Sequence, residues 1–245
     1  MRIAIAGGTG TIGRHVVDVV RAAGHEPAVI SRSCGVDVIT RVGLDDALRD
    51  TSVVIDVSNL TTVSAKKSTK FFETATQNLI DAGQRAGVTH HLVLSIVGID
   101  RVDLGYYKGK RAQERLALAG PIPATVLRAT QFHEFASQML ARGGPFAIVP
   151  RMTTQPIAAR EVADALVTLA LGPPVGRAPD IAGPEQRQMS DMVRALVRVR
   201  GEHRLMVPLR LPGAVGRAVA NGGLLPTSDG PRGTQTFDQW LATNG

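Results

Sequence analysis

A tyrosine and a lysine lie four residues apart in the segment from Gly105 to Lys110, which is predicted to open a helix. Side chains at positions i and i+4 project from one face of a helix, so Tyr106 and Lys110 should lie together. A nearby ammonium favours the phenolate and lowers the pKa of a tyrosine from its usual value of about 10. Tyr106 could then exchange a proton with a substrate oxygen. Ser95, which ends a predicted strand eleven residues earlier, could hydrogen-bond the same oxygen.

Four glycines follow the first apolar segment, Arg2 to Ala6, which predicts a buried strand. They occupy positions 7, 8, 10 and 13 and fit both G-x-x-G-x-x-G and G-x-G-x-x-G, and a helical pattern begins directly afterwards. A strand that enters such a turn and opens a helix can hold a pyrophosphate on free backbone N–H groups and the positive helix end. The alternative is a strand–helix turn that only needs flexible residues. The residues expected to contact a dinucleotide here are Gly7, Thr9, Gly10, Thr11, Ile12 and Gly13.

The second predicted strand, Glu26 to Ile30, ends in Ser31-Arg32-Ser33, where the adenosine ribose of a bound dinucleotide would lie. An acidic residue at this point would accept the 2′-hydroxyl of NAD, but none occurs before Asp37. A guanidinium pairs well with phosphate, and the two serine hydroxyls add donors. The sequence therefore predicts NADP(H), with Ser31, Arg32 and Ser33 at its 2′-phosphate. The alternative is that Arg32 is an ordinary loop arginine.

Three further segments, 56–59, 95–98 and 128–131, also follow or end predicted strands. Ligands of open α/β sheets lie across the carboxyl ends of the strands, so these segments should meet at the cofactor. The nicotinamide would then exchange hydride beside the predicted catalytic residues, Ser95, Tyr106 and Lys110. The remaining cofactor contacts expected from these segments and the following helix are Val57, Ser58, Asn59, Ser95, Lys110 and Thr130.

Strands and helices alternate over the first 130 residues, which predicts a parallel sheet covered on both faces. Right-handed crossovers make such a sheet doubly wound, so the predicted fold class is α/β. Besides the two strands named above, predicted strands span 36–39, 53–57, 91–95 and 124–128, and predicted helices span 11–23, 44–49, 65–86 and 106–119.

The pattern loosens after Phe132. Residues 1–150 are therefore predicted to form the cofactor-binding domain, and residues 151–245 a substrate-covering part without an independent core. In this later region, predicted helices span 132–141, 160–171, 190–199 and 234–243, predicted strands span 146–149 and 180–182, and a tail rich in Gly and Pro spans 209–233.

Composition excludes several classes of protein. The chain has 245 residues, of which 44% are hydrophobic, and its mean hydropathy of +0.06 is that of an ordinary globular protein. No apolar run approaches the length that crosses a bilayer, and no secretory leader precedes the first strand. Cys34 is the single cysteine, so we expect no internal disulfide and a cytoplasmic location. Neither a metal site nor a membrane partner is expected.

The net charge of +7 raises the question of nucleic acid, because arginines are dense between Arg187 and Arg210. In this stretch Met192, Val193 and Leu196 form an apolar helical stripe, and most arginines lie off it. This pattern is typical of a solvated helix face. Aromatic residues make up only 4% of the chain, which offers little base stacking. The composition therefore does not favour a nucleic-acid partner.

The glycine turn, the Ser31-Arg32 pair, and Tyr106-x-x-x-Lys110 followed by Gln113-Glu114 resemble the short-chain dehydrogenase/reductase superfamily, specifically its atypical NmrA-like, NAD(P)H-binding branch. Leu94-Ser95 and residues 127–132 carry the same resemblance, which thins after about Gly172. The family implies a Rossmann-type domain whose small C-terminal part closes over the nicotinamide. It also implies that the lysine holds the nicotinamide ribose while serine and tyrosine handle the proton. Those roles fall on Lys110, Ser95 and Tyr106.

Two functions of different kinds follow from these observations. The first is an NADPH-dependent oxidoreductase that reduces a small carbonyl or quinone-like substrate. Some members of the NmrA-like branch bind NADP without turnover, so the second is a non-catalytic redox-sensing regulator that binds a partner protein. DNA binding through the arginine-rich region ranks third. The sequence leaves open both the substrate and whether the chain forms a homo-oligomer.

Overall fold

Six strands form the main sheet of the computed structural model, which describes residues 1–141 and 145–244. Their order across the sheet is β2-β1-β3-β4-β5-β8. In the parallel pairing, Ala6 lies opposite both Ile30 and Asp56, so neighbouring strands end at one edge. The predicted α/β fold with a parallel sheet is confirmed. The strands are β1 (Arg2–Ala6), β2 (Glu26–Ile30), β3 (Thr51–Asp56), β4 (His90–Ile96), β5 (Ala124–Ala129) and β8 (Gly176–Arg177).

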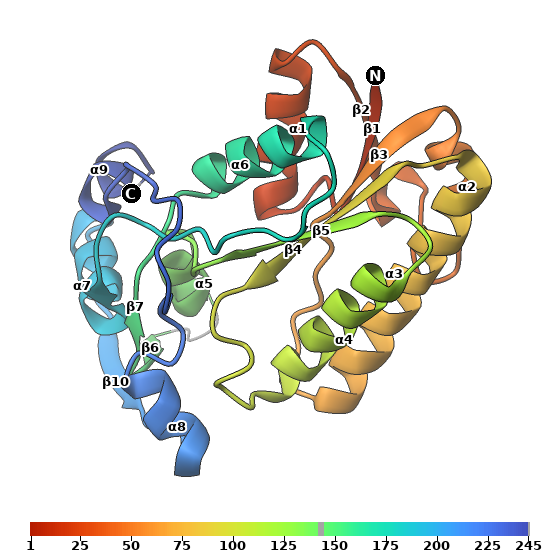
Figure 1. The fold of residues 1–245 in the computed structure, drawn as a ribbon. Helices are drawn as coiled ribbons and strands as arrows, with labels where there is room; N and C mark the ends of the chain where they lie inside the picture. The colour runs from red at the N-terminus through yellow and green to blue at the C-terminus, as the bar shows by residue number, and fades with distance from the viewer. Residues whose placement is uncertain (142–144, 245) are drawn as a thin grey trace. The chain divides into compact units, whose positions relative to one another are not determined.

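Helices cover both faces of this sheet (Figure 1). On one side lie α1 (Thr11–Ala22) and α6 (Ala159–Leu171), and on the other lie α3 (Ala65–Ala86) and α4 (Gly105–Ala119). Successive side chains of a strand point to opposite faces, and a sheet covered twice must therefore be apolar on both. In β1, Ile3 and Ile5 on one face and Ala4 and Ala6 on the other are all fully buried.

The prediction of a short strand at residues 36–39 is wrong. These residues form a turn in which the backbone N–H of Ile39 donates to Asp37 Oδ1 at 2.8 Å, and that of Asp37 donates to the Val42 carbonyl at 3.0 Å. An aspartate that caps its own backbone in this way competes with strand pairing. Val36 and Val38 instead pack against the core beside α2 (Leu44–Leu48).

The chain divides into two compact units, each assembled from several segments. The first unit contains Met1–Ser95, Leu104–Arg128 and Arg160–Ala178, and therefore the whole region from the glycine turn to Lys110. The second contains Ile96–Asp103, Ala129–Ala159 and Pro179–Gly245. The chain crosses between the units repeatedly, so a single boundary at residue 150 does not describe them.

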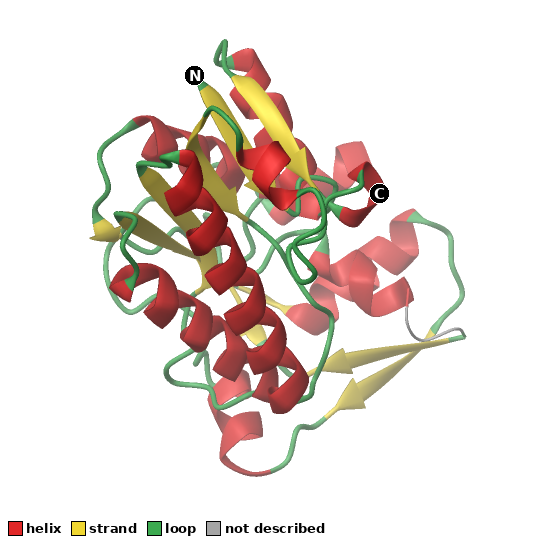
Figure 2. Cartoon of the chain, turned by 90° about the vertical axis from the view of Figure 1, so that its right-hand side faces the viewer, coloured by secondary structure: helices red, strands yellow, loops and turns green. Residues whose placement is uncertain are grey.

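The second unit contains two small sheets. In one, β6 (Phe146–Pro150) and β10 (Leu205–Leu209) form a parallel two-stranded ribbon (Figure 2). In the other, β7 (Thr153–Thr154) pairs with β9 (Arg187–Gln188) in antiparallel fashion. The helices of this unit are α5 (Phe135–Ala141), α7 (Met189–Val199), α8 (Gly213–Ala220) and α9 (Phe237–Asn244).

Several predictions for the second unit need correction. The strand predicted at 180–182 is present only as isolated bridges, Ala129 to Ile181 and Ala182 to Arg232, because Gly183 and Pro184 end the extended segment. The stretch 205–220 contains β10 and α8, of which the sequence predicted neither. Within the described residues, no helix is both long enough and apolar enough to traverse a bilayer.

Candidate cofactor and proton-transfer site

The glycine turn joins β1, α1 and the end of β3. Gly7 has φ +84°, a left-handed conformation that favours glycine, and its N–H donates to the Ile30 carbonyl at 2.9 Å. A Cβ at Gly7 would lie 2.9 Å from both Ser58 Cα and the Val57 carbonyl oxygen. A Cβ at Gly13 would lie only 2.1 Å from the Gly7 carbonyl oxygen. Glycine at these two positions lets the helix and the β3 loop approach the turn closely.

The N-terminus of α1 is suited to an anion. Gly10 is its N-cap, so no side chain caps the helix, and the first turn contains no acidic residue. The first N–H groups of a helix have no partner within the helix and carry its positive partial charge. Phosphate oxygens bind well in such places. The residues present therefore fit the pyrophosphate that the sequence predicts.

Ser31, Arg32 and Ser33 directly follow β2, at the same edge of the sheet as the glycine turn. Arg32 begins a short 3₁₀ helix (Arg32–Cys34), and the hydroxyls of Ser31 and Ser33 lie 2.9 Å apart. Among the residues that the structure describes, no carboxylate forms an ion pair with Arg32, which is exposed. A guanidinium in this position is available to a phosphate.

Lys110 is buried at the inner face of α4, with 4% of its surface exposed. Its Nζ donates to the Leu94 carbonyl at 2.6 Å and to Gln113 Oε1, and lies 4.7 Å from the centre of the Phe72 ring. Burial lowers the pKa of Lys110 to about 8, although the nearby carboxylates of Asp56 and Glu114 oppose the shift. The ammonium therefore loses its proton near pH 8, well below the range in which an exposed lysine titrates.

Tyr106 lies one turn before Lys110, and its hydroxyl donates to Asn59 Oδ1 at 2.7 Å. Burial, and then the neighbouring Tyr107, raise the pKa of Tyr106. The expectation that Lys110 lowers this pKa is therefore wrong, because the ammonium bonds to Leu94 and Gln113 and burial dominates at the phenol. A phenol with a raised pKa stays protonated and can donate a hydrogen bond to a substrate oxygen, but it releases its proton less readily than an ordinary tyrosine.

The loop after β3 connects the glycine turn with Tyr106. Ser58 lies against Gly7, and Asn59, the next residue, accepts the Tyr106 hydrogen bond. Asp56 holds the loop, since its Oδ1 accepts from the Ser58 N–H at 2.9 Å. The structure thus brings Val57, Ser58 and Asn59 between the predicted cofactor turn and the predicted proton donor. Their contacts with a cofactor remain predictions.

Sequence reasoning missed the role of Gln113, which is fully buried. Its Oε1 accepts from Lys110, and its Nε2 donates to Asp56 Oδ2 at 2.8 Å. The amide therefore links the carboxylate under the β3 loop to the lysine. Its position three residues after Lys110, on the same side of a helix, is the signal that could have identified it.

Glu114 is a second residue that the sequence did not single out as part of a site. Its carboxylate receives two hydrogen bonds from Arg128, at 2.8 and 2.7 Å, and one from Arg177 at 2.7 Å. Burial alone would raise the pKa of Glu114, but the hydrogen bonds from Arg128 and Arg177, together with the nearby Ser95 hydroxyl, outweigh it, and the pKa is lowered. Ser95, which is 2% exposed, thus lies beside an anchored carboxylate.

Two glycines let α4 approach α3. A Cβ at Gly105 would lie 2.5 Å from the Val63 carbonyl oxygen, and one at Gly109 would lie 2.6 Å from the Ser68 carbonyl carbon. The Ser68 hydroxyl donates to the Tyr106 carbonyl at 2.7 Å across this contact. The Gly105-x-x-x-Gly109 spacing is the sequence signal for this close packing, which fixes the start of the helix that carries Tyr106 and Lys110.

Thr130 belongs to the second unit. Its hydroxyl donates to the Gln155 carbonyl at 2.6 Å, and its N–H donates to the Ile181 carbonyl at 3.1 Å. The predicted contact between Thr130 and a cofactor bound by the first unit remains a prediction.

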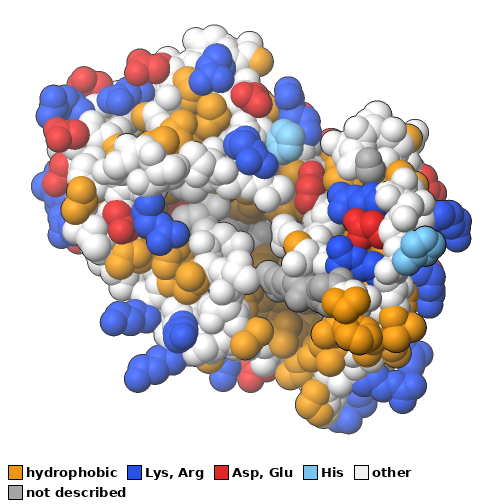
Figure 3. All heavy atoms as spheres, turned by 180° about the vertical axis from the view of Figure 1, so that it is seen from behind, with side chains coloured by type: hydrophobic (Ala, Val, Ile, Leu, Met, Phe, Trp, Pro, Cys, Tyr) orange, Lys and Arg blue, Asp and Glu red, His pale blue; other side chains and the backbone are white. Residues whose placement is uncertain are grey.

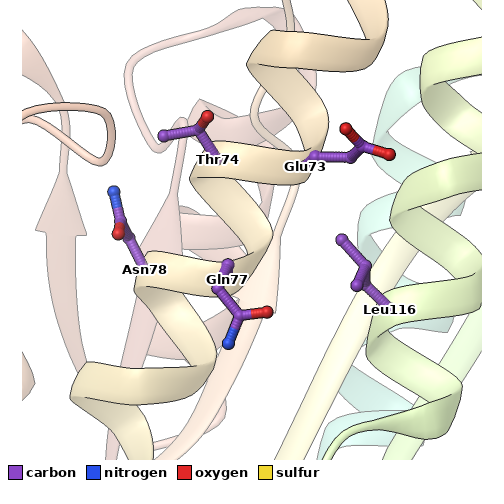
Figure 4. A pocket seen from close by; sticks show the side chains of 5 residues that line it. All are labelled: Glu73, Thr74, Gln77, Asn78 and Leu116. Carbon is purple, nitrogen blue, oxygen red and sulfur yellow. The ribbon is translucent and has the colours of Figure 1, made fainter.

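A shallow hollow lies on the outer surface of α3 and α4, lined by Glu73, Thr74, Gln77, Asn78 and Leu116 (Figure 4). Its amides are already in use, because Asn78 Nδ2 donates to the Val38 and Ile39 carbonyls and Gln77 Nε2 donates to Asp81. None of these residues belongs to the predicted site, and the hollow offers no comparable phosphate-binding groups.

We expect Glu114→Gln to lower the free energy of unfolding by about 2 kcal/mol, because a buried carboxylate bonded to two arginines becomes a neutral amide. Glu73→Gln is the control, since Glu73 pairs with Arg115 at the surface at 3.7 Å and should change stability by less than about 1 kcal/mol. Urea denaturation measures both. The lowered pKa stabilises the native state above the usual pKa of the carboxyl, and the variant should lose less stability than the wild type as the pH falls below it. Equal losses in the two variants would contradict this account.

No family model matches the sequence, and no curated protein matches it. Solved structures do. A short-chain dehydrogenase/reductase superfamily protein from Agrobacterium tumefaciens with bound NAD shares 15% identity over 99% of this chain and 95% of that chain, with a TM-score of 0.70. An NADPH-dependent quinone oxidoreductase (QOR2) from Escherichia coli shares 18% identity over 98% of each chain, with a TM-score of 0.68.

A third structure, RMD from Pseudomonas aeruginosa complexed with NADPH, shares 15% identity over 98% of this chain and 96% of that chain, with a TM-score of 0.66. The chain has the Rossmann-type α/β fold of these three structures. At such identities the likeness concerns the fold. The structures hold NAD in one case and NADPH in another, so the likeness does not choose between the two cofactors.

Proposed function

We propose that the chain is an NADPH-dependent oxidoreductase of the short-chain dehydrogenase/reductase type, from its NmrA-like branch, which reduces a small carbonyl or quinone-like compound. The observation that carries the proposal is the β3 loop, which lies against Gly7 through Ser58 and receives the Tyr106 hydroxyl through Asn59. A phosphate-binding turn and a proton donor are thereby joined within one unit. The similarity to an NADPH-dependent quinone oxidoreductase supports the substrate class.

In this proposal different residues bind the cofactor, donate the proton and orient the reacting groups. The N–H groups at the start of α1 bind the pyrophosphate, and Arg32 binds the 2′-phosphate. Bound NADPH supplies the hydride. Tyr106, whose raised pKa keeps it protonated, donates a proton to the substrate oxygen that gains charge during reduction. Lys110 and Ser95 orient the reacting groups. Gln113 holds Lys110, and Ser95 lies beside Glu114.

The first test is cofactor choice. We expect wild-type protein to bind NADPH more tightly than NADH in a fluorescence titration. Arg32→Ala should weaken NADPH binding about tenfold or more, because a charge-assisted contact to phosphate is lost, while NADH binding stays the same. Arg21→Ala, which removes an exposed arginine of α1, is the matched control and should change neither. A wild-type preference for NADH would contradict the assignment of Arg32.

The second test is turnover, followed by the nicotinamide absorbance over a panel of carbonyls and quinones. Tyr106→Phe removes the proposed donor and should lower kcat about a hundredfold. Tyr107→Phe is the control, because the adjacent phenol is not assigned a role. Wild-type turnover in Tyr106→Phe would show that another group donates the proton.

A second candidate is a non-catalytic NADP(H)-responsive regulator that binds a partner protein. One observation favours it: burial raises the pKa of Tyr106, which makes its phenol a weaker acid than an ordinary tyrosine. This function would give NADPH binding with no turnover over the same panel, and an affinity for a partner protein that changes between NADPH and NADP. A single substrate turned over by the wild type and not by Tyr106→Phe would decide against it.

A further inference from the structure

The ribbon formed by β6 and β10 has two apolar faces. Its register pairs Leu205 with Phe146, Val207 with Ile148, and Leu209 with Pro150. Paired residues of neighbouring strands project to the same side, so these side chains share one face. The other face contains Ala147 and Val149, which are buried, and β6 packs against α5 and α7. One face of the ribbon therefore completes the core of the second unit.

The face that contains Phe146, Ile148, Leu205, Val207 and Leu209 is exposed, and we call it the apolar ribbon face. Its exposed fractions are high for large apolar side chains: Phe146 46%, Ile148 47%, Leu205 65%, Val207 37% and Leu209 42%. A sheet with one covered face normally places polar residues on the other. A contiguous apolar face of this kind marks an interaction surface.

Positive charge lies at one end of this face. Arg151 and Arg210 follow β6 and β10 directly, both are exposed, and the Arg151 N–H donates to the Leu209 carbonyl at 3.1 Å, so the two strand ends lie together. From Asp191 to Asp229 the sequence has six arginines and three acidic residues, and two of the arginines, Arg194 and Arg204, pair with Asp191 and Glu202. Figure 3 shows orange apolar side chains gathered over the region of β6 and β10, with blue basic side chains beside them. The partner should therefore be anionic as well as apolar.

The apolar side chains and the adjacent arginines favour a lipid surface over a second copy of the chain or an added strand. A second copy of the chain would bring the same arginines face to face, and five side chains fall short of the roughly 800 Å² per partner that a standard protein interface buries. Strand addition along β10 is disfavoured because Pro208 in its middle cannot donate a hydrogen bond. A lipid surface needs no complementary shape, and long arginine side chains can reach its phosphates while neighbouring apolar groups enter the acyl boundary.

We infer that the apolar ribbon face docks on the surface of an anionic phospholipid bilayer. Phe146, Ile148 and Leu205 enter the boundary between headgroups and acyl chains, while Arg151 and Arg210 pair with lipid phosphates. The composition led us to expect no membrane partner because no segment can span a bilayer. Peripheral docking needs no spanning segment, so the two observations are compatible.

Cosedimentation of the full chain with vesicles tests this inference. We expect sedimentation with vesicles of phosphatidylcholine and phosphatidylglycerol, not with phosphatidylcholine alone, and release at high salt. Phe146→Ser/Leu205→Ser and Arg151→Gln/Arg210→Gln should each lower the affinity about tenfold or more. Leu171→Ser/Val175→Ser is the matched control: these first-unit side chains are 43% and 50% exposed, and the variant should bind like the wild type. Thermal melts check that all variants fold.

Three results would overturn the inference. They are no sedimentation of the wild type, equal sedimentation with neutral vesicles, or unchanged binding in Phe146→Ser/Leu205→Ser. Light scattering covers the second-copy alternative. A wild-type dimer that Phe146→Ser/Leu205→Ser converts to a monomer, without vesicle binding, would assign the face to self-association. None of these readouts depends on NADPH or turnover, so they are independent of the proposed function.

Discussion

Replacing Gly13 with alanine is expected to destabilise the protein by about 3 kcal/mol or more, whereas replacing Gly10 should leave stability nearly unchanged and weaken cofactor binding. A Cβ at Gly13 would lie 2.1 Å from the Gly7 carbonyl oxygen and 2.7 Å from Gly8 Cα, which are backbone atoms that cannot move without opening the turn. A Cβ at Gly10 would have only the Gly7 carbonyl oxygen nearby, at 3.2 Å, and Gly10 has an ordinary φ of −75°.

The two substitutions therefore separate the functional explanation of the turn from the purely structural one. Gly10 is where the backbone must come close to a pyrophosphate, so a methyl group there should lower NADPH affinity about a hundredfold or more. Gly13→Ala should lower Tm by roughly 10 °C for a chain of this size. Thermal melts and fluorescence titrations measure both properties on both variants. If Gly10→Ala bound NADPH like the wild type, the turn would serve the fold alone.

The glycine turn also shows why the first half of the chain could be predicted. Each signal there is local: an apolar strand, glycines at fixed spacing, and a helical pattern that begins at once. Such signals do not depend on distant residues, and the structure agrees with β1, α1, β2 and α3 closely. The strand expected at 36–39 failed because Asp37 offered the backbone a competing hydrogen bond.

The second unit was harder to predict because its strands are defined by distant partners. β10 pairs with β6 across more than fifty residues, and its sequence LMVPL contains a proline that argues against a strand until an edge position is known. The alternation of polar and apolar residues that indicates a half-exposed strand is absent here, since both faces of the ribbon are apolar. The presence of apolar residues on both faces made β10 hard to predict from the sequence, and the same feature suggests that the exposed face contacts lipid.

The sequence predicted which residues form the candidate site better than it predicted their hydrogen bonds and pKa shifts. Sequence spacing placed Tyr106 and Lys110 on one helix, and the structure does so. It could not show that the lysine points to Leu94 and Gln113, or that burial raises the pKa of the tyrosine. Desolvation depends on the packing of Phe72, α3 and β4 around the helix, which no local pattern encodes.

Lys110 should make stability and activity depend on pH in opposite directions. Its pKa is about 8 in the folded protein and about 10.5 in the unfolded chain. Between these values the unfolded chain binds a proton that the native protein does not, so the free energy of unfolding rises with pH in this window, by about 3 kcal/mol at most. If the ammonium orients the reacting groups as proposed, kcat/KM falls as the pH rises through 8.

Lys110→Met should remove both effects. Methionine fills a similar volume without a titrating group, so the rise in stability between pH 8 and 10.5 should disappear, and kcat/KM should fall about a hundredfold at neutral pH. Lys108→Met, which removes an exposed lysine two residues earlier on α4, is the control and should keep the rise and the activity. A rise that survives in Lys110→Met would place the titration on another group. Loss of the rise with full activity would leave Lys110 as a buried structural lysine, held by Leu94 and Gln113 without a role in the reaction.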